Sequence, residues 1–366
     1  MTPDIQSPPP PAIAAPHSTE IYYGGPDQPA GALRDVLKAR VDAAPPGSEI
    51  TWATYYFRDQ ALAESLVAAQ RRGVRVRVRV EGSPRRGAAN DGVITTLREG
   101  LGDGLRTHRA WFGASHLHAK VYAFSGPSPE VLIGSFNPSG DEDDDNPKLI
   151  ADIGDQDRGE NLLVGFRDPK AVLALRRQAE RLWQGKVGRF GRYENRAVNL
   201  KSVRFYYYPR LRPDVVERRI ARLGPGDRVE AAISHMDQGP FVQQLAEAAR
   251  RGVDVHLVVH DTARRVPNGV VRTLGDAGVT VRRYCNVDGL PMHAKFVLID
   301  RGGERSAWFG SLNYNITSRF LNKEILARST DDAVVADLQA RFQTIAQAAD
   351  REATFCGKSR QVSAGR

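Results

Sequence analysis

Two short motifs place a histidine and a lysine two positions apart within apolar segments. The first motif holds His118 and Lys120, and the second holds His293 and Lys295. If each segment is a β-strand, both side chains of a motif point to the same face, because residues two apart on a strand share a face. A histidine can attack phosphorus or transfer a proton, and a lysine can stabilise negative charge on phosphate oxygens. The motifs therefore predict phosphoryl chemistry that uses two histidines.

A Gly-Ser-x-Asn segment follows each motif at a similar distance. The first segment contains Ser135 and Asn137, and the second contains Ser311 and Asn313. Glycine permits a close approach of the backbone, and the serine hydroxyl and asparagine amide can donate hydrogen bonds to phosphate oxygens. These four residues are therefore candidates to bind phosphate.

Acidic residues near both motifs are candidates to support the histidines. Glu160 and Glu324 lie downstream of the two Gly-Ser-x-Asn segments, and either could accept a hydrogen bond from a histidine ring and fix its tautomer. Asp300 lies five positions after Lys295, and on a continuing strand this odd offset turns it away from the histidine. We therefore expect Asp300 to have a supporting role. Ser125 occupies the corresponding position after the first motif.

The elements that must position these residues are repeated along the chain. Residues 48–82 and 227–261 both read as strand, loop, amphipathic helix, glycine turn and strand, and they share an Arg-Arg-Gly-Val sequence. The His-x-Lys and Gly-Ser-x-Asn motifs recur in the same order at nearly the same spacing, which indicates a duplicated unit. Strands that alternate with helices in this way predict an α/β architecture in which helices cover a sheet.

Together these motifs resemble the signature of the phospholipase D superfamily, which is His-x-Lys-x4-Asp followed by Gly-Ser-x-Asn, present twice. The second copy matches in full, whereas the first has Ser125 in place of the aspartate. Glu324 follows Asn322, but Glu160 precedes Asn161. The resemblance covers nearly the whole chain. It implies a phospholipase D-like fold of two similar α/β halves, each with a mixed sheet flanked by helices, and an active site at their pseudo-twofold interface.

The resemblance also implies a reaction scheme. One histidine attacks phosphorus to give a phosphohistidine, and the other protonates the leaving oxygen and then activates water or an alcohol. We assign His118 as the nucleophile and His293 as the general acid, because the first copy usually attacks in two-copy relatives. The groups expected to stabilise charge on the non-bridging oxygens are Lys120, Lys295, Asn137 and Asn313. The scheme requires neither a metal ion nor another cofactor.

The formal net charge of +9 predicts an anionic partner, and the expected substrate is the phosphodiester of a phospholipid. Such a substrate requires apolar surface near the site. Aromatic residues could supply that surface or could equally pack in the core: Tyr55, Tyr56, Phe57, Trp111, Phe112, Trp308, Phe309 and Tyr314. A metal-independent nuclease acting on DNA or RNA is one alternative. A phosphate-binding pseudoenzyme is another, because Ser125 replaces the aspartate of the motif. The sequence does not distinguish hydrolysis from transfer.

The expected domain organisation follows the repeat. A disordered, proline-rich lead covers residues 1–18, the two halves cover residues 19–196 and 197–353, and a flexible tail covers residues 354–366. An insertion at residues 139–158 contains an acidic run, which we interpret as a solvated loop rather than a metal site.

Cellular location can be approached from what the chain contains. No stretch approaches the roughly 18 consecutive apolar residues of a spanning helix, and the N-terminus does not resemble a signal peptide. Only Cys285 and Cys356 occur, and their separation argues against a disulfide. We therefore expect a cytoplasmic protein without a transmembrane segment, and we expect it to be a monomer.

Overall fold

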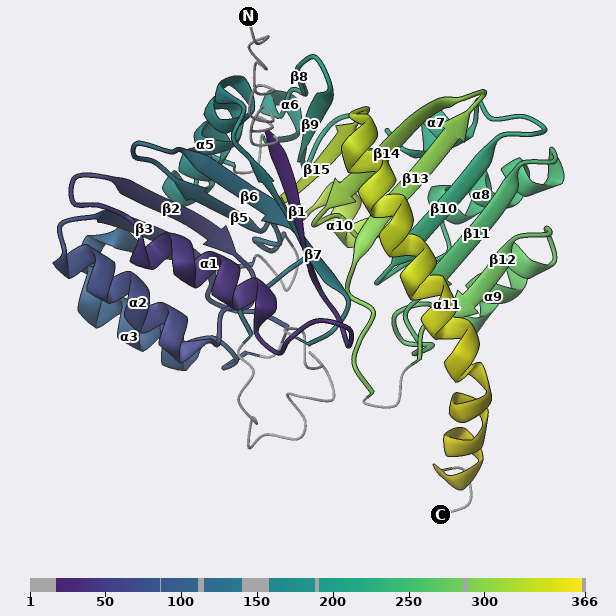
Figure 1. Ribbon diagram of the computed structural model, residues 1–366, viewed down its shortest axis with the longest axis horizontal. Coiled ribbons are helices and arrows are strands. Elements are labelled where there is room, and N and C mark those ends of the chain that lie inside the picture. The colour runs from purple at the N-terminus through teal and green to yellow at the C-terminus, as the bar shows by residue number, and fades with distance from the viewer. Residues whose placement is uncertain are drawn as a thin grey trace, which may run out of the picture.

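The fold is known from a computed structural model, shown in Figure 1. The structure describes residues 18–85, 87–110, 115–139, 158–187, 191–285 and 289–363, and it describes side chains as far as residue 349. The acidic run of the insertion, the proline-rich lead up to residue 17 and the end of the tail lie outside these ranges. The boundaries expected between the halves and the tail stay predictions.

The first half contains a mixed sheet of seven strands. The strands are β1 (Thr19–Gly24), β2 (Glu49–Thr54), β3 (Arg75–Glu81), β4 (Leu105–His108), β5 (Val121–Phe124), β6 (Glu130–Gly134) and β7 (Asn161–Phe166). Their order across the sheet is β1-β7-β6-β5-β2-β3-β4. The pairs β2–β3 and β3–β4 are parallel, and the other neighbours are antiparallel.

The second half contains a mixed sheet of eight strands. They are β8 (Val198–Asn199), β9 (Val203–Tyr208), β10 (Arg228–Ile233), β11 (Asp254–Val259), β12 (Thr280–Arg283), β13 (Lys295–Arg301), β14 (Glu304–Gly310) and β15 (Glu324–Ser329). Their order is β12-β11-β10-β13-β14-β15-β9-β8. Read from β9 to β12, this order and the parallel pairs β10–β11 and β11–β12 repeat the first sheet strand for strand. The predicted duplication and the mixed sheets are therefore confirmed.

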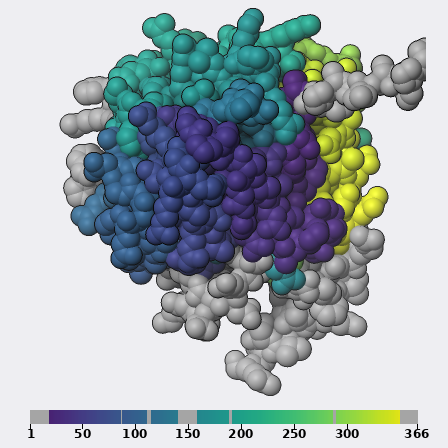
Figure 2. Space-filling model, turned by 60° about the vertical axis from the view of Figure 1, so that its left-hand side comes forward, coloured from purple at the N-terminus to yellow at the C-terminus, as the bar shows by residue number. Residues whose placement is uncertain are grey.

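Helices cover the outer face of each sheet. The first sheet is covered by α1 (Ala32–Asp42), α2 (Gln60–Arg71) and α3 (Asp91–Leu101), which belong to the purple to blue part of the surface in Figure 2. Helix α3 leads through η1 (Gly102–Gly104) into β4. The second sheet is covered by α7 (Glu217–Ile220), α8 (Pro240–Arg250) and α9 (Asn268–Gly275). The predicted turn after each long helix contains a glycine in the left-handed region, Gly73 at φ 92° and Gly252 at φ 88°.

The inner faces of the two sheets share one hydrophobic core. Phe166 of β7 contacts Phe205 of β9 and Phe309 of β14, with ring centroids 5.2 and 6.4 Å apart. Helix α5 (Pro169–Gln184) and helix α11 (Asp332–Ser363) complete this core. Two further short helices are α6 (Gly191–Glu194), before the second sheet begins, and α10 (Ile316–Phe320), between β14 and β15. The shared core fixes the two halves against each other, and this fixed relation positions the site.

Two further observations concern the predicted location. Cys285 is disulfide-bonded, so the expectation that the cysteines form no disulfide is wrong. The separation of the two cysteines along the chain therefore gives no support to the cytoplasmic prediction. Within the part of the chain that the structure describes, no helix combines the length and the apolar character needed to cross a bilayer.

Candidate active site

Each histidine of the two motifs is held by the backbone of the opposite half. The amide of His118 donates to the carbonyl of Lys323 over 3.0 Å, and the amide of His293 donates to the carbonyl of Glu160 over 2.9 Å. The histidines were expected inside strands, but β5 begins after Lys120 and β13 begins at Lys295. The extended segments before these strands cross to the other sheet instead. The contact between the halves therefore sets the histidine positions.

The histidine side chains also cross between the halves. Nδ1 of His118 lies 2.9 Å from the carboxylate of Glu324, and Nδ1 of His293 lies 2.8 Å from Oδ1 of Asn161. Because both partners accept, each Nδ1 carries the proton and each Nε2 keeps its lone pair for chemistry. The two pairs occupy equivalent positions, at the starts of β15 and β7. One histidine therefore faces a carboxylate, and the other faces a neutral amide.

The two serines of the Gly-Ser-x-Asn segments orient these partners. Ser135 accepts from the amide of Leu162 and donates to Oδ1 of Asn161 over 2.9 Å. Ser311 accepts from the amide of Ile325 and donates to Glu324 over 2.5 Å. Both serines are buried behind the histidines. Their hydroxyl protons are committed, so they support the site instead of donating to phosphate.

Glu160 does not orient a histidine, contrary to expectation. Its carboxylate is buried and binds Arg341 over 2.6 Å and the hydroxyl of Tyr284 over 2.9 Å. Asn161 takes the position that matches Glu324, and Glu160 matches Lys323. Matching the strand residues that follow, Asn-Leu-Leu-Val with Glu-Ile-Leu-Ala, would have found this alignment. The insertion after the first Gly-Ser-x-Asn segment hid it.

Asp300 and Ser125 lie at the ends of their strands remote from the histidines. The Asp300 carboxylate accepts from the amide of Gly303 over 2.9 Å in the β13–β14 turn. Ser125 accepts from the amide of Glu49 over 2.8 Å. Both residues support strand ends, so the replacement of the aspartate in the first motif leaves the reactive groups in place.

Burial strongly perturbs the four motif side chains. Burial lowers the pKa of His118 to about 4, against the opposing charge of Glu324, and it lowers the pKa of Lys120 to about 7. Burial also lowers the pKa of His293 and of Lys295 well below their ordinary values. Each ammonium nitrogen donates 2.7 Å to the carbonyl of the histidine in its own motif. Both histidines are therefore neutral near pH 7, and an arriving anion would favour protonation of the lysines.

The carboxylate of Glu324, which contacts His118, keeps its negative charge although it is buried. Burial alone would raise the pKa of Glu324, but the charges and hydrogen bonds of His118, Lys120 and Ser311 hold that pKa below its ordinary value. Glu324 is therefore ionised at neutral pH. The ring of Tyr55 lies 5.1 Å from the ring of His118 and 5.6 Å from the ammonium of Lys120, so Tyr55 packs against both motif side chains.

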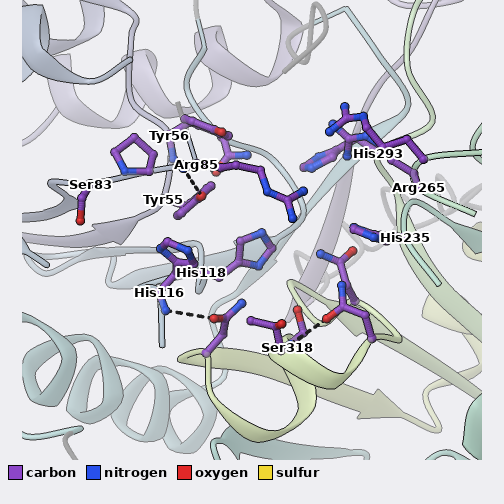
Figure 3. A pocket seen from close by; sticks show the side chains of 17 residues that line it. Tyr55, Tyr56, Ser83, Arg85, His116, His118, His235, Arg265, His293 and Ser318 are labelled. Atoms are coloured by element: carbon purple, nitrogen blue, oxygen red, sulfur yellow. Dashed lines mark hydrogen bonds between the residues drawn. The ribbon is translucent and has the colours of Figure 1, made fainter. Parts of the chain in front are cut away.

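A polar cavity of about 400 Å³ opens over the two histidines, which enter it from opposite halves (Figure 3). Asn137 and Asn313 line it as expected. Oδ1 of Asn137 accepts from the amide of Tyr56 at 3.3 Å, which directs the NH₂ end of that amide elsewhere. The cavity is large enough for a phosphodiester with part of its substituents.

Several cavity residues were not predicted. They are Ser83, Arg85, His116, His235, Arg264 and Arg265. All but His116 follow the carboxyl ends of the parallel strands β3, β10 and β11. Ligands in open α/β sheets bind at this edge, so these positions could have been predicted from the strand pattern.

The aromatic residues proposed to supply apolar surface mostly do not reach the cavity. Only Tyr55 and Tyr56 line it, and both are buried. The others that the structure describes, Phe57, Trp308, Phe309 and Tyr314, pack in the cores. Trp111 and Phe112 lie outside the described residues.

Known proteins resemble this chain in sequence and in fold. Phospholipase D Y from Dictyostelium discoideum is 31% identical over 110 residues, and the match covers 29% of this chain and 24% of that protein. Phosphatidylserine synthase from Haemophilus influenzae superposes with a TM-score of 0.63 at 12% identity, over 91% of this chain and 86% of that one. Polyphosphate kinase from Porphyromonas gingivalis gives 0.59 at 14% identity, over 89% and 50%. At these identities the structural matches show the fold alone.

A sequence model of one protein family matches both halves of the chain. The model described as "Cardiolipin synthase, PLD-like domain" matches residues 37–152 and 224–346, which is more than half of the chain. The matched regions contain both His-x-Lys motifs and both Gly-Ser-x-Asn segments. The chain therefore belongs to this phospholipase D-like family.

Proposed function

We propose that the chain is a phosphodiesterase of the phospholipase D type that acts on a phospholipid through a phosphohistidine on His118. The observation that carries this proposal is the unequal support of the two histidines. Glu324 gives His118 a negative charge, whereas Asn161 gives His293 a neutral acceptor. The two histidines occupy equivalent positions, but their different partners suit them to different steps of the reaction.

His118 is suited to attack. Its Nε2 lone pair would form a bond to phosphorus while the bond from phosphorus to the leaving oxygen breaks. The imidazole ring gains positive charge in this step, and the carboxylate of Glu324 at Nδ1 stabilises that charge. A neutral partner would stabilise it less, which argues against attack by His293.

His293 is suited to transfer protons. The anionic phosphodiester, placed between the motifs, favours proton binding at the nearby bases, and His293 would give its proton from Nε2 to the leaving oxygen. Because Asn161 offers no charge to retain that proton, the imidazolium is a strong acid. Neutral His293 then removes a proton from water or an alcohol, which attacks phosphorus and frees His118.

Charge on the non-bridging oxygens would be stabilised by the two lysines and two asparagines of the motifs. Lys120 and Lys295 are fully or almost fully buried, so water screens their charge weakly once they are protonated. Asn137 and Asn313 line the cavity and can donate from their amide groups. These groups belong to the chain itself, so the proposed chemistry is independent of a metal ion.

A phospholipid fits the site better than a nucleic acid. Stacking on bases requires exposed aromatic rings, but both aromatic residues that line the cavity, Tyr55 and Tyr56, are buried. The family description and the name of the Dictyostelium relative point to lipid phosphodiesters. A pseudoenzyme is disfavoured because both histidines are present and oriented.

The test is a substrate comparison in the presence of EDTA. Purified protein is incubated with phospholipid vesicles, with single-stranded DNA or with bis(4-nitrophenyl) phosphate, alongside His118→Ala and His293→Ala. We expect release of the lipid head group, no shortening of DNA and loss of turnover in both variants. Cleavage of DNA alone would contradict the lipid assignment, and turnover in either variant at the wild-type rate would contradict the two-histidine scheme.

A further inference from the structure

A short helix beside the cavity presents apolar side chains to solvent. The segment around α10 lines the cavity with Asn315, Thr317 and Ser318, and Figure 3 shows Ser318 facing it. On the same segment Ile316 is 64% exposed and Phe320 is 45% exposed. One side of this segment therefore belongs to the cavity, and another side is apolar and open.

Ile316 and Phe320 form a group of exposed apolar residues with a third residue, Leu321. Ile316 and Phe320 are four positions apart, so they lie on one face of the helix, and Leu321 follows directly at 37% exposure. The described residues contain three more large hydrophobic side chains with comparable exposure, Leu173, Tyr193 and Leu211, and none of them lines the cavity. Tyr193 and Leu211 belong to neighbouring segments, because the amide of Leu211 donates to the carbonyl of Arg192 over 3.1 Å. The group beside the cavity is therefore a concentration of apolar surface.

The segment is held rigidly from beneath. Oδ1 of Asn315 accepts from the amide of Ser318 over 2.8 Å and caps the helix. The guanidinium of Arg319 forms a buried ion pair with Glu217. The contacts of Asn315 and Arg319 therefore hold the helix in place, and its exposed side chains are fixed with it. Among the described residues, nothing covers these exposed side chains.

The charges around the same cavity indicate what kind of surface meets this helix. Arg85 and Arg264 line the cavity and are exposed, and the chain carries a net charge of +9. Apolar side chains and exposed cations around one cavity match an anionic bilayer, whose head groups are charged above an acyl layer. Figure 3 shows that Arg85 reaches the cavity from the half opposite to Ser318.

We propose that Ile316, Phe320 and Leu321 form a membrane-docking rim that enters the outer acyl region of an anionic phospholipid bilayer. Docking would place the cavity at the level of the head groups, where the phosphodiester lies, and the exposed arginines would meet the anionic head groups. This inference rests on the proposed function, because it supplies the lipid to the same site.

The experiment measures flotation of the protein with vesicles of phosphatidylcholine containing phosphatidylglycerol. The rim variant Ile316→Ser/Phe320→Ser/Leu321→Ser is compared with the control Leu173→Ser/Leu211→Ser, whose parent side chains are 49% and 62% exposed away from the cavity. We expect the rim variant to bind about 100-fold more weakly than wild type, and the control to bind within about twofold of it. Equal binding of the rim variant and wild type would overturn the proposal.

A second variant covers the case in which the triple change disturbs folding. Phe320→Trp should give indole fluorescence that brominated lipids quench on vesicle binding, and absence of quenching would overturn the proposal. Loss of DNA binding in the rim variant, with vesicle binding retained, would overturn it in favour of a nucleic acid.

Hydrolysis distinguishes failure of docking from failure of the proposed function. We expect the ratio of vesicle hydrolysis to bis(4-nitrophenyl) phosphate hydrolysis to fall about 100-fold in the rim variant, in line with its binding. If wild type cleaves neither substrate yet docks through the rim, the proposed function fails and the docking surface stands. If wild type cleaves both and the ratio is unchanged, the docking surface fails and the function stands.

Discussion

His118 of the first half and Glu324 of the second half are joined over 2.9 Å, across the interface between two copies of one folding unit. The matching pair on the other side is His293 with Asn161. A duplicated unit would be expected to repeat the same partner. Here one copy keeps a carboxylate and the other an amide, so the symmetry of the fold does not extend to the charges of the site.

Neutralising the partner of His118 should slow the reaction. Glu324→Gln keeps an acceptor for Nδ1 but removes the negative charge that stabilises the phosphohistidine, and we expect kcat to fall about 100-fold. Steady-state kinetics on a soluble phosphodiester measure the effect. Ser311→Ala is a milder companion, because it removes one hydrogen bond to the same carboxylate. An unchanged kcat in Glu324→Gln would show that the carboxylate does not assist attack.

The reciprocal change at His293 should move the pH profile. Asn161→Asp places a carboxylate at Nδ1, which favours the protonated ring and raises the pKa of His293 from its depressed value. We expect the pH dependence of kcat to shift to higher pH. NMR titration of the His293 ring provides a direct check, and a ring that titrates as in wild type would contradict the assignment.

The free enzyme should be active in a pH window set by two motif groups. Attack needs neutral His118, whose pKa is lowered to about 4, so kcat/KM rises as the pH increases through that value. Binding of the anion is favoured by protonated Lys120, whose pKa is lowered to about 7, so kcat/KM falls above it. Lys120→Arg stays charged and should remove the alkaline decline. A decline that persists in this variant would assign it to another group.

The buried Lys295 side chain should lower the free energy of unfolding of the protein. Burial depresses its pKa well below the ordinary value, so the unfolded state binds a proton that the folded state does not, and stability rises with pH until the ordinary lysine pKa. We expect Lys295→Met to be inactive yet more stable by about 1–2 kcal/mol near pH 7. Denaturant titration at several pH values should show the gain shrinking as the pH rises. A gain independent of pH would contradict the desolvation argument.

Glu160 should matter for stability more than for chemistry. Its buried ion pair with Arg341 ties the residue before β7 to α11. Arg341 also pairs with Asp27 over 2.6 Å, so loss of the Glu160 charge leaves Arg341 with one carboxylate in place of two. We expect Glu160→Gln to cost about 2 kcal/mol of unfolding free energy, because one charged hydrogen bond is lost while Arg341 keeps Asp27, and we expect kcat to stay within about threefold. Glu160→Gln/Arg341→Met should recover part of the loss. A large fall in kcat with normal stability would return Glu160 to the catalytic residues.

The sequence predicts the repeated features well and the contacts between halves poorly. The two His-x-Lys motifs and the strand–helix–strand repeat are local patterns, and they indicate both the duplicated fold and the two histidines that reach the cavity. The partner of His293 is set by packing between the halves and by strand pairing across an insertion. The sequence therefore pointed to Glu160 as the partner of a histidine ring, whereas the structure has Asn161 in that place. The disulfide of Cys285 was missed for a similar reason, because separation along the chain does not give distance in the fold.

The division of labour between the histidines is tested most directly by trapping the covalent intermediate. A phospholipid reaction is quenched in alkali, where phosphohistidine is stable, and the peptides containing His118 and His293 are analysed by mass spectrometry. We predict a phosphorylated or phosphatidylated His118, with more of it in His293→Asn, because water is then activated poorly. The same adduct on His293, with none on His118, would contradict the account.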